Sequence, residues 1–446
     1  MFDLLDPQAR ACPHLYNQWL QSDLGRRVYK APFENSFYVV HRYEDVKFVL
    51  TNHKLFSSAI LPTRQSPFLA LMDGEDHLRQ RAIVTEIFQI EAPTFPLKNI
   101  QKFIQQTTLA CVQKKRADVL DQWATVIPLA SLSMVFGLTA DRTALEKLHD
   151  YAMIINRALF VLGGTGPRRQ PTPTLREKLA ISYSLLKNIS KLRRLKKSVG
   201  SEGWATLKRM FLPVKTQYEN PRPDFSYMPD ALHALLELMI MFEEALVDEG
   251  NQSHGVKILR QSIHENKISK LEAILLCTFI LFAGYETSVS LISNGVAHLA
   301  KDKALLKQLK QNPGRLDSFI EECLRFYTPV GRFLRRTNEE VRIGEYIIPK
   351  GAMVIAMLTA TNTDPDRFSD SYSFLSEREK NAHISFGKGI HFCVGAPLAR
   401  FQAKVSFQEL LAIVNTITID PEKKLEWVTD RDNGILRYEE LWINFD

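Results

Sequence analysis

A glycine-rich loop at residues 384–395 contains Cys393, the cysteine best placed for chemistry. The loop has three glycines, and an apolar helix is predicted to begin just after it, near Pro397. A helix N-terminus favours a thiolate over a thiol, because its free N–H groups and its dipole stabilise negative charge. A thiolate held in this way can be an axial ligand to iron. The alternative is a buried structural cysteine in a tight turn, which is commoner but leaves the glycines and His391 unexplained.

A second group of polar residues lies at positions 283–288, inside an otherwise apolar helical pattern. Gly284 weakens a helix by about 1 kcal/mol relative to alanine, and an unpaired buried carboxylate such as Glu286 costs more. Two interpretations remain open for this segment. It is either a polar kink satisfied by local hydrogen bonds, or a proton-handling pair, Glu286 and Thr287, beside a bound group.

The helix that carries this pair is predicted to begin after Ser269, which forms a capping box with Glu272, and to continue to about Ala300. A helix of about 30 residues spans roughly 45 Å, so it must run through a hydrophobic core. Its most apolar run, residues 273–285, is too short to cross a bilayer and is typical of a buried core helix.

The other elements place this helix in a mainly α-helical chain. A strand is predicted at residues 36–40 and helices at 43–50 and 76–88, after which helical patterns dominate to about residue 326. Short β-type runs follow at residues 346–348 and 354–357. There is no internal repeat and no Gly/Ser linker, so we predict a mainly α fold with a small β portion, in which residues 1–446 form one large domain.

The Cys393 loop resembles the haem-binding signature of the cytochrome P450 family, the haem-thiolate monooxygenases. The positions of that signature are occupied by Phe386, Gly389, His391, Cys393 and Gly395. This signature is highly specific for the family, and the resemblance extends from about residue 30 to the C-terminus in the pattern of the soluble bacterial members. The resemblance implies the cytochrome P450 fold, with haem enclosed between the long central helix and the Cys393 loop.

Three further motifs stand in the family's order. Ala283-Gly284-x-Glu286-Thr287 resembles the oxygen-activation motif, Glu322-x-x-Arg325 the Glu-x-x-Arg motif, and His77-x-x-x-Arg81 the propionate-binding helix. Glu339-x-x-Arg342 also fits the Glu-x-x-Arg pattern, by accident. The Tyr327-Thr328-Pro329-Val330 sequence that follows Arg325 identifies Glu322-x-x-Arg325 as the motif.

The resemblance implies a role for each of these residues. Haem b would be the cofactor, with Cys393 as the metal ligand and Phe386 and Gly395 beside the sulfur. The haem propionates would be bound by His77, Arg81, Arg335 and His391. Ala283 and Gly284 would contact the haem, Gly284 would let the helix open locally to make room for oxygen, and Glu286 and Thr287 would relay protons. Glu322 and Arg325 would form a structural buried ion pair.

The expected substrate pocket is lined by large apolar residues from four segments: Leu61, Phe68, Phe279, Phe282, Val330, Phe333, Ile435 and Leu436. Such a pocket favours a hydrophobic small molecule of lipid, terpenoid or polyketide type, as in secondary metabolism. The expected reaction is the insertion of one atom of O2 into that substrate. Because no flavin domain follows the cysteine helix, we expect electrons from separate proteins such as a ferredoxin and its reductase.

Two other functions remain open. One is a haem-thiolate peroxygenase or oxidative coupling enzyme, including one that acts on a carrier-bound substrate. The other is a haem-binding sensor without turnover. The Glu286–Thr287 pair favours the reaction that uses O2 and electrons.

The net charge of +7 is concentrated in one segment. Residues 165–216 contain 13 basic and 2 acidic residues, a net charge of +11, so the rest of the chain carries −4. This segment falls where the family has its sixth and seventh helices, and we interpret it as a basic amphipathic insertion in the lid over the substrate channel.

Within the insertion, residues 185–211 combine an apolar stripe with lysines and arginines. Three interpretations are open: a lid helix packed on the core, a membrane-surface helix, or a contact for an acidic carrier protein. A nucleic-acid partner is disfavoured because no recognition motif accompanies the charge. The N-terminus has no signal-peptide pattern, so we expect a cytoplasmic protein, with peripheral membrane contact as an option.

Overall fold

The computed structural model describes residues 13–23, 26–30, 37–60, 68–162, 175–211, 228–428 and 434–446, without the side chains of Pro13, Leu15 and residues 156–162 and 209–211. Its contacts divide the chain into two units. The first consists of Met1–Ser58, Leu97–Pro128 and Gly284–Asp446, and the second of Ala59–Pro96 and Leu129–Ala283. Leu61 and parts of the 165–216 insertion lie outside the described residues.

The first unit contains three small sheets. Its five-stranded sheet has the order β1-β2-β8-β5-β3, in which β2 and β8 are parallel and the other pairs antiparallel. These strands are β1 (Val28–Lys30), β2 (Phe37–Val40), β3 (Phe56–Ser57), β5 (Arg332–Thr337) and β8 (Met353–Met357). A second sheet joins β4 (Arg116–Asp118), β10 (Trp442–Phe445) and β9 (Ile417–Ile419), and a hairpin joins β6 (Val341–Ile343) and β7 (Tyr346–Ile348).

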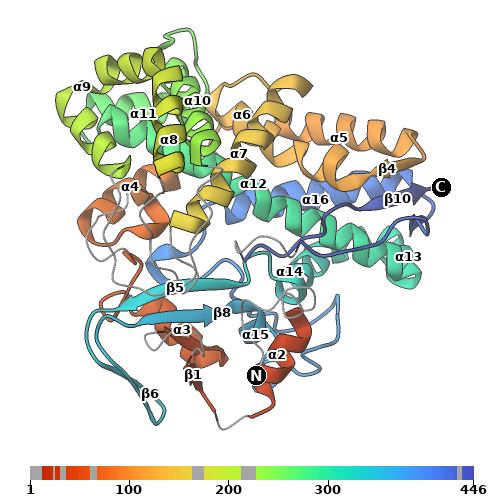
Figure 1. Ribbon diagram of the computed structural model, residues 1–446. Coiled ribbons are helices and arrows are strands. Elements are labelled where there is room, and N and C mark those ends of the chain that lie inside the picture. Colours follow the sequence, from red (N-terminus) through yellow and green to blue (C-terminus); the bar gives the residue numbers. More distant parts are fainter. Residues whose placement is uncertain are drawn as a thin grey trace. The chain divides into compact units, whose positions relative to one another are not determined.

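The first unit also contains helices. They are α2 (Pro13–Gln21), α3 (Tyr43–Thr51), α5 (Leu97–Gln113), α13 (Lys303–Gln311), α14 (Leu316–Tyr327), α15 (Leu358–Asn362) and α16 (Ala396–Ile413), with short turns η2 (Leu120–Ala124), η3 (Pro313–Arg315) and η4 (Gly389–His391). These helices contact two of the sheets, since α3 contacts β8, α15 contacts β5 and α5 contacts β4. Every residue of β8 is buried, and Val46, Val49 and Leu50 of α3 belong to the same core as β8. In Figure 1, α16 runs alongside α5, and β5 alongside β8.

The second unit is helical. It contains η1 (Leu69–Leu71), α4 (Gly74–Ile87), α7 (Arg142–Leu162), α8 (Leu175–Lys187), α9 (Ile189–Phe211), α10 (Met228–Val247) and α11 (His254–His264). α10 contacts α7, α8 and α9. Two helices, α6 (Val126–Phe136) and α12 (Lys270–Lys301), contribute residues to both units. The prediction of a mainly α fold with a small β portion is confirmed.

α12 matches the long helix expected from the sequence. Its capping box is formed in both directions, because the Ser269 backbone N–H donates to Glu272 Oε2 at 2.8 Å and the Glu272 N–H donates to Ser269 Oγ at 3.2 Å. By length and composition α12 could cross a membrane, the one helix of the described chain that passes this test. Its most apolar stretch is 78% buried in the protein, as expected of a core helix.

Candidate functional site

The Cys393 loop is folded tightly onto itself before α16. The Cys393 N–H donates to the Phe386 carbonyl at 2.8 Å, and the Phe392 N–H donates to the Gly389 carbonyl at 3.1 Å. Gly395 is the residue before α16, and the Ala399 N–H donates to its carbonyl at 2.9 Å. The fold therefore places Cys393 at the N-terminal end of an 18-residue helix, as the sequence predicted.

Two glycines allow the loop to adopt this shape. Gly387 and Gly389 both have φ of +71°, a conformation that side chains disfavour. A Cβ at Gly389 would lie 2.7 Å from the Leu50 carbonyl oxygen, so the end of α3 excludes any other residue there. At Gly395 a Cβ would meet only Cys393 Sγ, at 3.9 Å. The space beside the sulfur is therefore kept open, as a bound cofactor requires.

Cys393 differs from the other described cysteines in its exposure. Cys111, Cys277 and Cys323 are buried, whereas Cys393 is half-buried. Burial raises the pKa of Cys111 to about 12 and raises the pKa of the other two buried thiols as well. These three remain protonated near neutral pH, which leaves Cys393 as the described thiol suited to become a thiolate ligand.

A cation lies close to this loop. The Arg400 guanidinium is 4.5 Å from the centre of the Phe386 ring and donates two hydrogen bonds to Glu321, at 2.7 and 2.8 Å. The bond to Glu321 raises the pKa of Arg400, and the charge of Cys393 adds to this effect. Burial alone would raise the pKa of Glu321, but its bonds from Arg400 and His383 lower it to about 2.

One face of α12 is less buried than the rest of the helix. Ala283 is exposed, and Phe279, Gly284 and Thr287 are half-buried, although their neighbours Tyr285 and Glu286 are buried. The helix remains continuous through this segment. The Ser288 hydroxyl donates to the Gly284 carbonyl at 3.1 Å, a bond that competes with the helical ladder.

Glu286 is engaged by a residue that the sequence analysis did not identify. Arg437 Nε donates to Glu286 Oε1 at 3.3 Å, and both side chains are buried. Arg437 also donates to the Tyr438 carbonyl at 2.9 Å. The two partners are 151 positions apart, and no local pattern marks Arg437, so only the fold reveals this pair.

The face of α12 that carries Glu286 also binds the segment that contains Arg437. Ser290 Oγ and Asn294 Nδ2 both donate to the Leu436 carbonyl, at 2.5 and 3.0 Å. Glu286, Ser290 and Asn294 are spaced four apart and therefore share one helix face. Three polar residues of α12 thus fix residues 436–437 along the helix.

Several of the expected pocket residues come together within each unit. In the second unit, the ring centroids of Phe68, Phe279 and Phe282 lie 5.3–5.8 Å apart in pairs. In the first unit, Val330 and Ile435 form an isolated β-bridge, and the Leu436 N–H donates to the Pro329 carbonyl at 3.0 Å. Phe333 lies against Gly387 of the cysteine loop.

The four residues expected to bind propionates divide between the units. His77 is buried on α4 and Arg81 is half-buried one turn later. In the first unit, Arg335 is buried on β5 and donates to the Leu334 carbonyl at 2.7 Å, and His391 is half-buried in η4. A thiol beside open space, with a buried guanidinium in the same unit, fits haem as the bound group.

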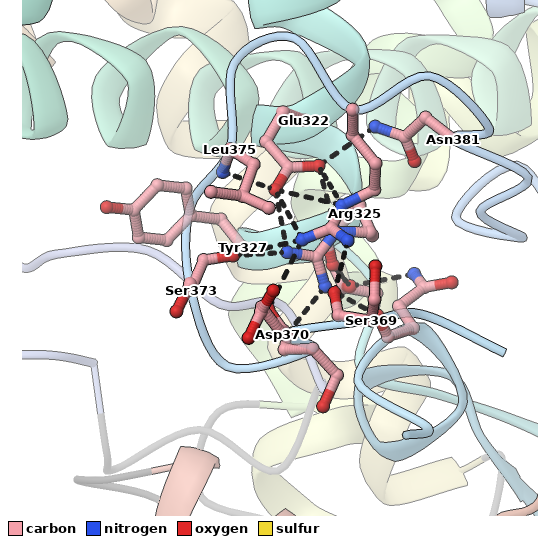
Figure 2. A network of polar contacts seen from close by, with 12 residues as sticks. Glu322, Arg325, Tyr327, Ser369, Asp370, Ser373, Leu375 and Asn381 are labelled. Carbon is pink, nitrogen blue, oxygen red and sulfur yellow. Dashed lines mark hydrogen bonds and ion pairs between the residues drawn. The ribbon is translucent and has the colours of Figure 1, made fainter. Parts of the chain in front are cut away.

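Figure 2 shows the buried ion pair of α14 and the contacts around it. Arg325 donates to both carboxylate oxygens of Glu322, at 2.7 and 2.8 Å, and neither side chain is exposed. Arg325 also donates to the carbonyls of Asn362, Ser371 and Ser373. Glu322 accepts further bonds from Arg378, Asn381 and the Leu375 backbone. The predicted structural ion pair is confirmed.

Comparison with known proteins identifies the family. The cytochrome P450 family model matches residues 184–425, which is more than half of the chain. Cytochrome P450 109 of Bacillus spizizenii is 27% identical over 379 residues, which are 84% of this chain and 78% of that protein. The beta-dihydromenaquinone-9 omega-hydroxylase of Mycobacterium tuberculosis is 25% identical over 422 residues, which are 94% of this chain and 74% of that protein.

A solved structure with the same fold is that of P450BioI in complex with an acyl carrier protein ligated to hexadec-9Z-enoic acid. It has a TM-score of 0.74 at 20% sequence identity, and the match covers 98% of this chain and 99% of that one. Members of the family bind haem through a cysteine thiolate and act as monooxygenases. The chain thus belongs to the cytochrome P450 family and is a haem-dependent oxidoreductase.

Proposed function

We propose that this enzyme inserts one oxygen atom of O2 into an unactivated position of a lipid-like substrate, with Cys393 as the ligand to haem iron. The observation that carries the assignment is the half-buried thiol of Cys393 beside the open space at Gly395, while the other described thiols are buried. Bound haem supplies the iron at which O2 is reduced and one of its atoms is transferred to carbon.

The chain's own residues would set the charge around the cofactor. Arg400, in the first turns of α16, would contribute a positive charge near the sulfur of Cys393. Arg335 and His391 of the first unit, with His77 and Arg81 of α4, would donate hydrogen bonds to the two carboxylates of haem. Phe386, held under the Arg400 guanidinium, would cover the sulfur.

Proton delivery is assigned to α12. Thr287 Oγ1 belongs to the less buried helix face and would hand protons toward the oxygen that is lost as water. Glu286 is the adjacent carboxylate that would relay them. Its contact with Arg437 determines where the carboxylate is held, so Arg437 is a positioning residue for this step.

The substrate is proposed to be an apolar chain or ring system. Phe68, Phe279 and Phe282 provide a cluster of aromatic faces in the second unit, and Val330, Ile435 and Leu436 an aliphatic one in the first. The relatives support this class, since one is named for an isoprenoid quinone and another was crystallised with a fatty acyl chain on its carrier protein. A carrier-bound acyl chain is therefore the second candidate substrate.

Electrons are proposed to come from a separate ferredoxin and its reductase, and the protein is proposed to act in the cytoplasm. The test is consumption of O2 and NADPH in the presence of surrogate redox proteins and a panel of fatty acids, quinones and acyl carrier conjugates. A hydroxylated product is expected. Reduced, haem-loaded protein with no NADPH-driven turnover on any member of the panel would favour the sensor function instead.

Two variants separate the roles within the site. Cys393→Ser is expected to lose the thiolate-type absorption band of the reduced CO complex, whereas Cys111→Ser keeps it. Thr287→Ala is expected to keep that band and to consume O2, but to lower product formation about tenfold or more, because a positioned proton donor contributes at least that much. Full turnover of Thr287→Ala with hydrogen peroxide alone, exceeding the rate with NADPH, would instead identify a peroxygenase.

A further inference from the structure

The outer face of α8 is apolar. Leu175, Leu179, Tyr183 and Leu186 are exposed by 75%, 62%, 59% and 64%, and Ile189 at the start of α9 by 42%. Helical hydrogen bonds continue from α8 into α9, because the Asn188 N–H donates to the Ser184 carbonyl and the Leu192 N–H to the Asn188 carbonyl. At spacings of four and three, these five side chains form one stripe, about 21 Å long from Leu175 to Ile189.

The fully buried residues on the inner side of this helical segment are polar, whereas Ile181 and Leu185 are half-buried. Ser184 and Asn188 are buried, and Ser184 Oγ donates to the Pro229 carbonyl at 2.9 Å. Asn188 Oδ1 lies 3.0 Å from His233 Nδ1 of α10. A surface helix of a water-soluble protein normally has the opposite arrangement, with its leucines turned inward. The exposed leucine stripe is therefore the face to which an apolar medium would bind.

Positive charges flank this stripe on both sides. Arg176 and Lys187 lie along one edge of the helix and Lys178 along the other, and all three are exposed. Lys187 Nζ is 4.9 Å from the Tyr183 ring. Residues 175–197 contain eight basic residues and a single acidic one. The surface is thus apolar at its centre and cationic at its margins.

In α9, unlike α8, leucines are buried and some of the basic residues form ion pairs within the protein. Leu195 and Leu207 are buried, and two of its cations are neutralised by α10, because Lys191 pairs with Glu237 at 2.9 Å and Arg194 pairs with Glu243 at 2.8 Å. Part of the basic segment at 185–211 is therefore packed on the protein, as in the packed-lid interpretation, although Arg193, Lys196, Lys197 and Lys208 stay exposed. The exposed apolar stripe lies on the α8 face.

We propose that the α8 face, residues 175–189, docks the enzyme on an anionic lipid surface. Leucine and tyrosine side chains would enter the headgroup boundary, and the flanking cations would meet lipid phosphates. A second copy of this chain is disfavoured, because two such faces would bring like charges together. An acidic carrier protein is less suited than a bilayer, because the centre of the face is a row of five exposed apolar side chains, which a bilayer buries and a polar, acidic surface does not. This inference does not depend on the proposed function.

The test uses the full-length, haem-loaded protein and sedimentation with vesicles. Binding is expected with vesicles of mixed phosphatidylcholine and phosphatidylglycerol, and it should weaken with phosphatidylcholine alone or at high salt. The double variant Leu179→Gln/Leu186→Gln should bind at least about tenfold more weakly, because two apolar side chains that would be buried in the bilayer are lost. Lys178→Gln and Lys187→Gln should each weaken binding roughly fivefold, at about 1 kcal/mol per charge.

The control is Leu109→Gln, which replaces a leucine that is 47% exposed on α5 and should bind vesicles like the unchanged protein. All variants should keep the CO-complex spectrum and the melting temperature, so a failure of catalysis is distinguishable from a failure of docking. Equal vesicle binding by the double variant overturns the proposal. A second result would also overturn it: the unchanged protein does not bind vesicles, and the double variant loses self-association or loses binding to an acidic acyl carrier protein.

Discussion

The contact between Glu286 and Arg437 places a carboxylate and a guanidinium together in a buried setting. Neither charge is well solvated, so each depends on the other. This arrangement explains how an acidic residue can be accommodated in the middle of a long helix whose most apolar stretch is largely buried. It also links the proposed proton pathway to the segment that carries Ile435 and Leu436.

Replacing one partner should therefore lower the free energy of unfolding much more than replacing both. We expect Arg437→Met to lower the free energy of unfolding by about 3–5 kcal/mol, because it removes the guanidinium that pairs with the buried Glu286 charge. The double variant Glu286→Gln/Arg437→Met should recover much of that loss. Denaturant unfolding of the single and double variants measures both values, and equal losses would show that the pair is not coupled.

At the scale of elements, α14 is anchored to the segment that follows α15 by one buried network. The guanidinium of Arg325 bonds to three backbone carbonyls between residues 362 and 373, and Glu322 bonds to Leu375, Arg378 and Asn381 (Figure 2). That segment has little regular structure of its own. The network therefore supplies hydrogen-bond partners that a helix or sheet would otherwise provide.

The chain contains a matched control for this network. Arg325→Lys keeps the charge but loses the planar fork, so it should lower the free energy of unfolding by several kcal/mol, about 3–5 by comparison with other buried pairs. Arg342→Lys, in the exposed Glu339-x-x-Arg342 occurrence, should change it by less than about 0.5 kcal/mol. Thermal or denaturant unfolding provides the comparison. A small effect of Arg325→Lys would contradict the structural role.

At the scale of the whole molecule, two buried histidines make stability depend on pH. Burial lowers the pKa of His41 and of His298 from 6.5 to about 4. In the unfolded chain both would take up protons near pH 6.5, so the unfolded state binds more protons between pH 6.5 and 4. The contribution of these two neutral histidines to the free energy of unfolding is fully present above pH 6.5, and it is lost as the pH falls toward 4.

This effect can be measured on His298, which bonds to the Tyr327 hydroxyl at 2.8 Å. The loss of unfolding free energy between pH 7 and pH 4.5 should be smaller by about 2 kcal/mol in His298→Gln than in the unchanged protein. His264→Gln, which replaces a histidine at an exposed position, is the matched control. An identical slope for His298→Gln would show that His298 does not titrate differently in the folded state.

The sequence alone determined the elements and the chemistry that depends on local spacing. The capping box at Ser269, the loop before α16 and the Glu322–Arg325 pair each involve residues a few positions apart, so their geometry follows from helix and turn rules. The same is true of the family, because its signature is a local pattern around Cys393. The roles of His77, Arg81, Glu286 and Thr287 toward haem remain predictions.

Only the tertiary structure decided which distant residues meet and which faces stay open. Arg437 is 151 positions from Glu286, and Arg400 is 79 positions from Glu321, so no spacing rule connects them. The burial of the basic segment likewise could not be predicted from the sequence. An amphipathic pattern indicates that one face differs from the other, but burial depends on what packs against it. The structure packs α9 inward and turns the leucines of α8 outward, because α10 presents carboxylates to α9 and polar partners to Ser184 and Asn188.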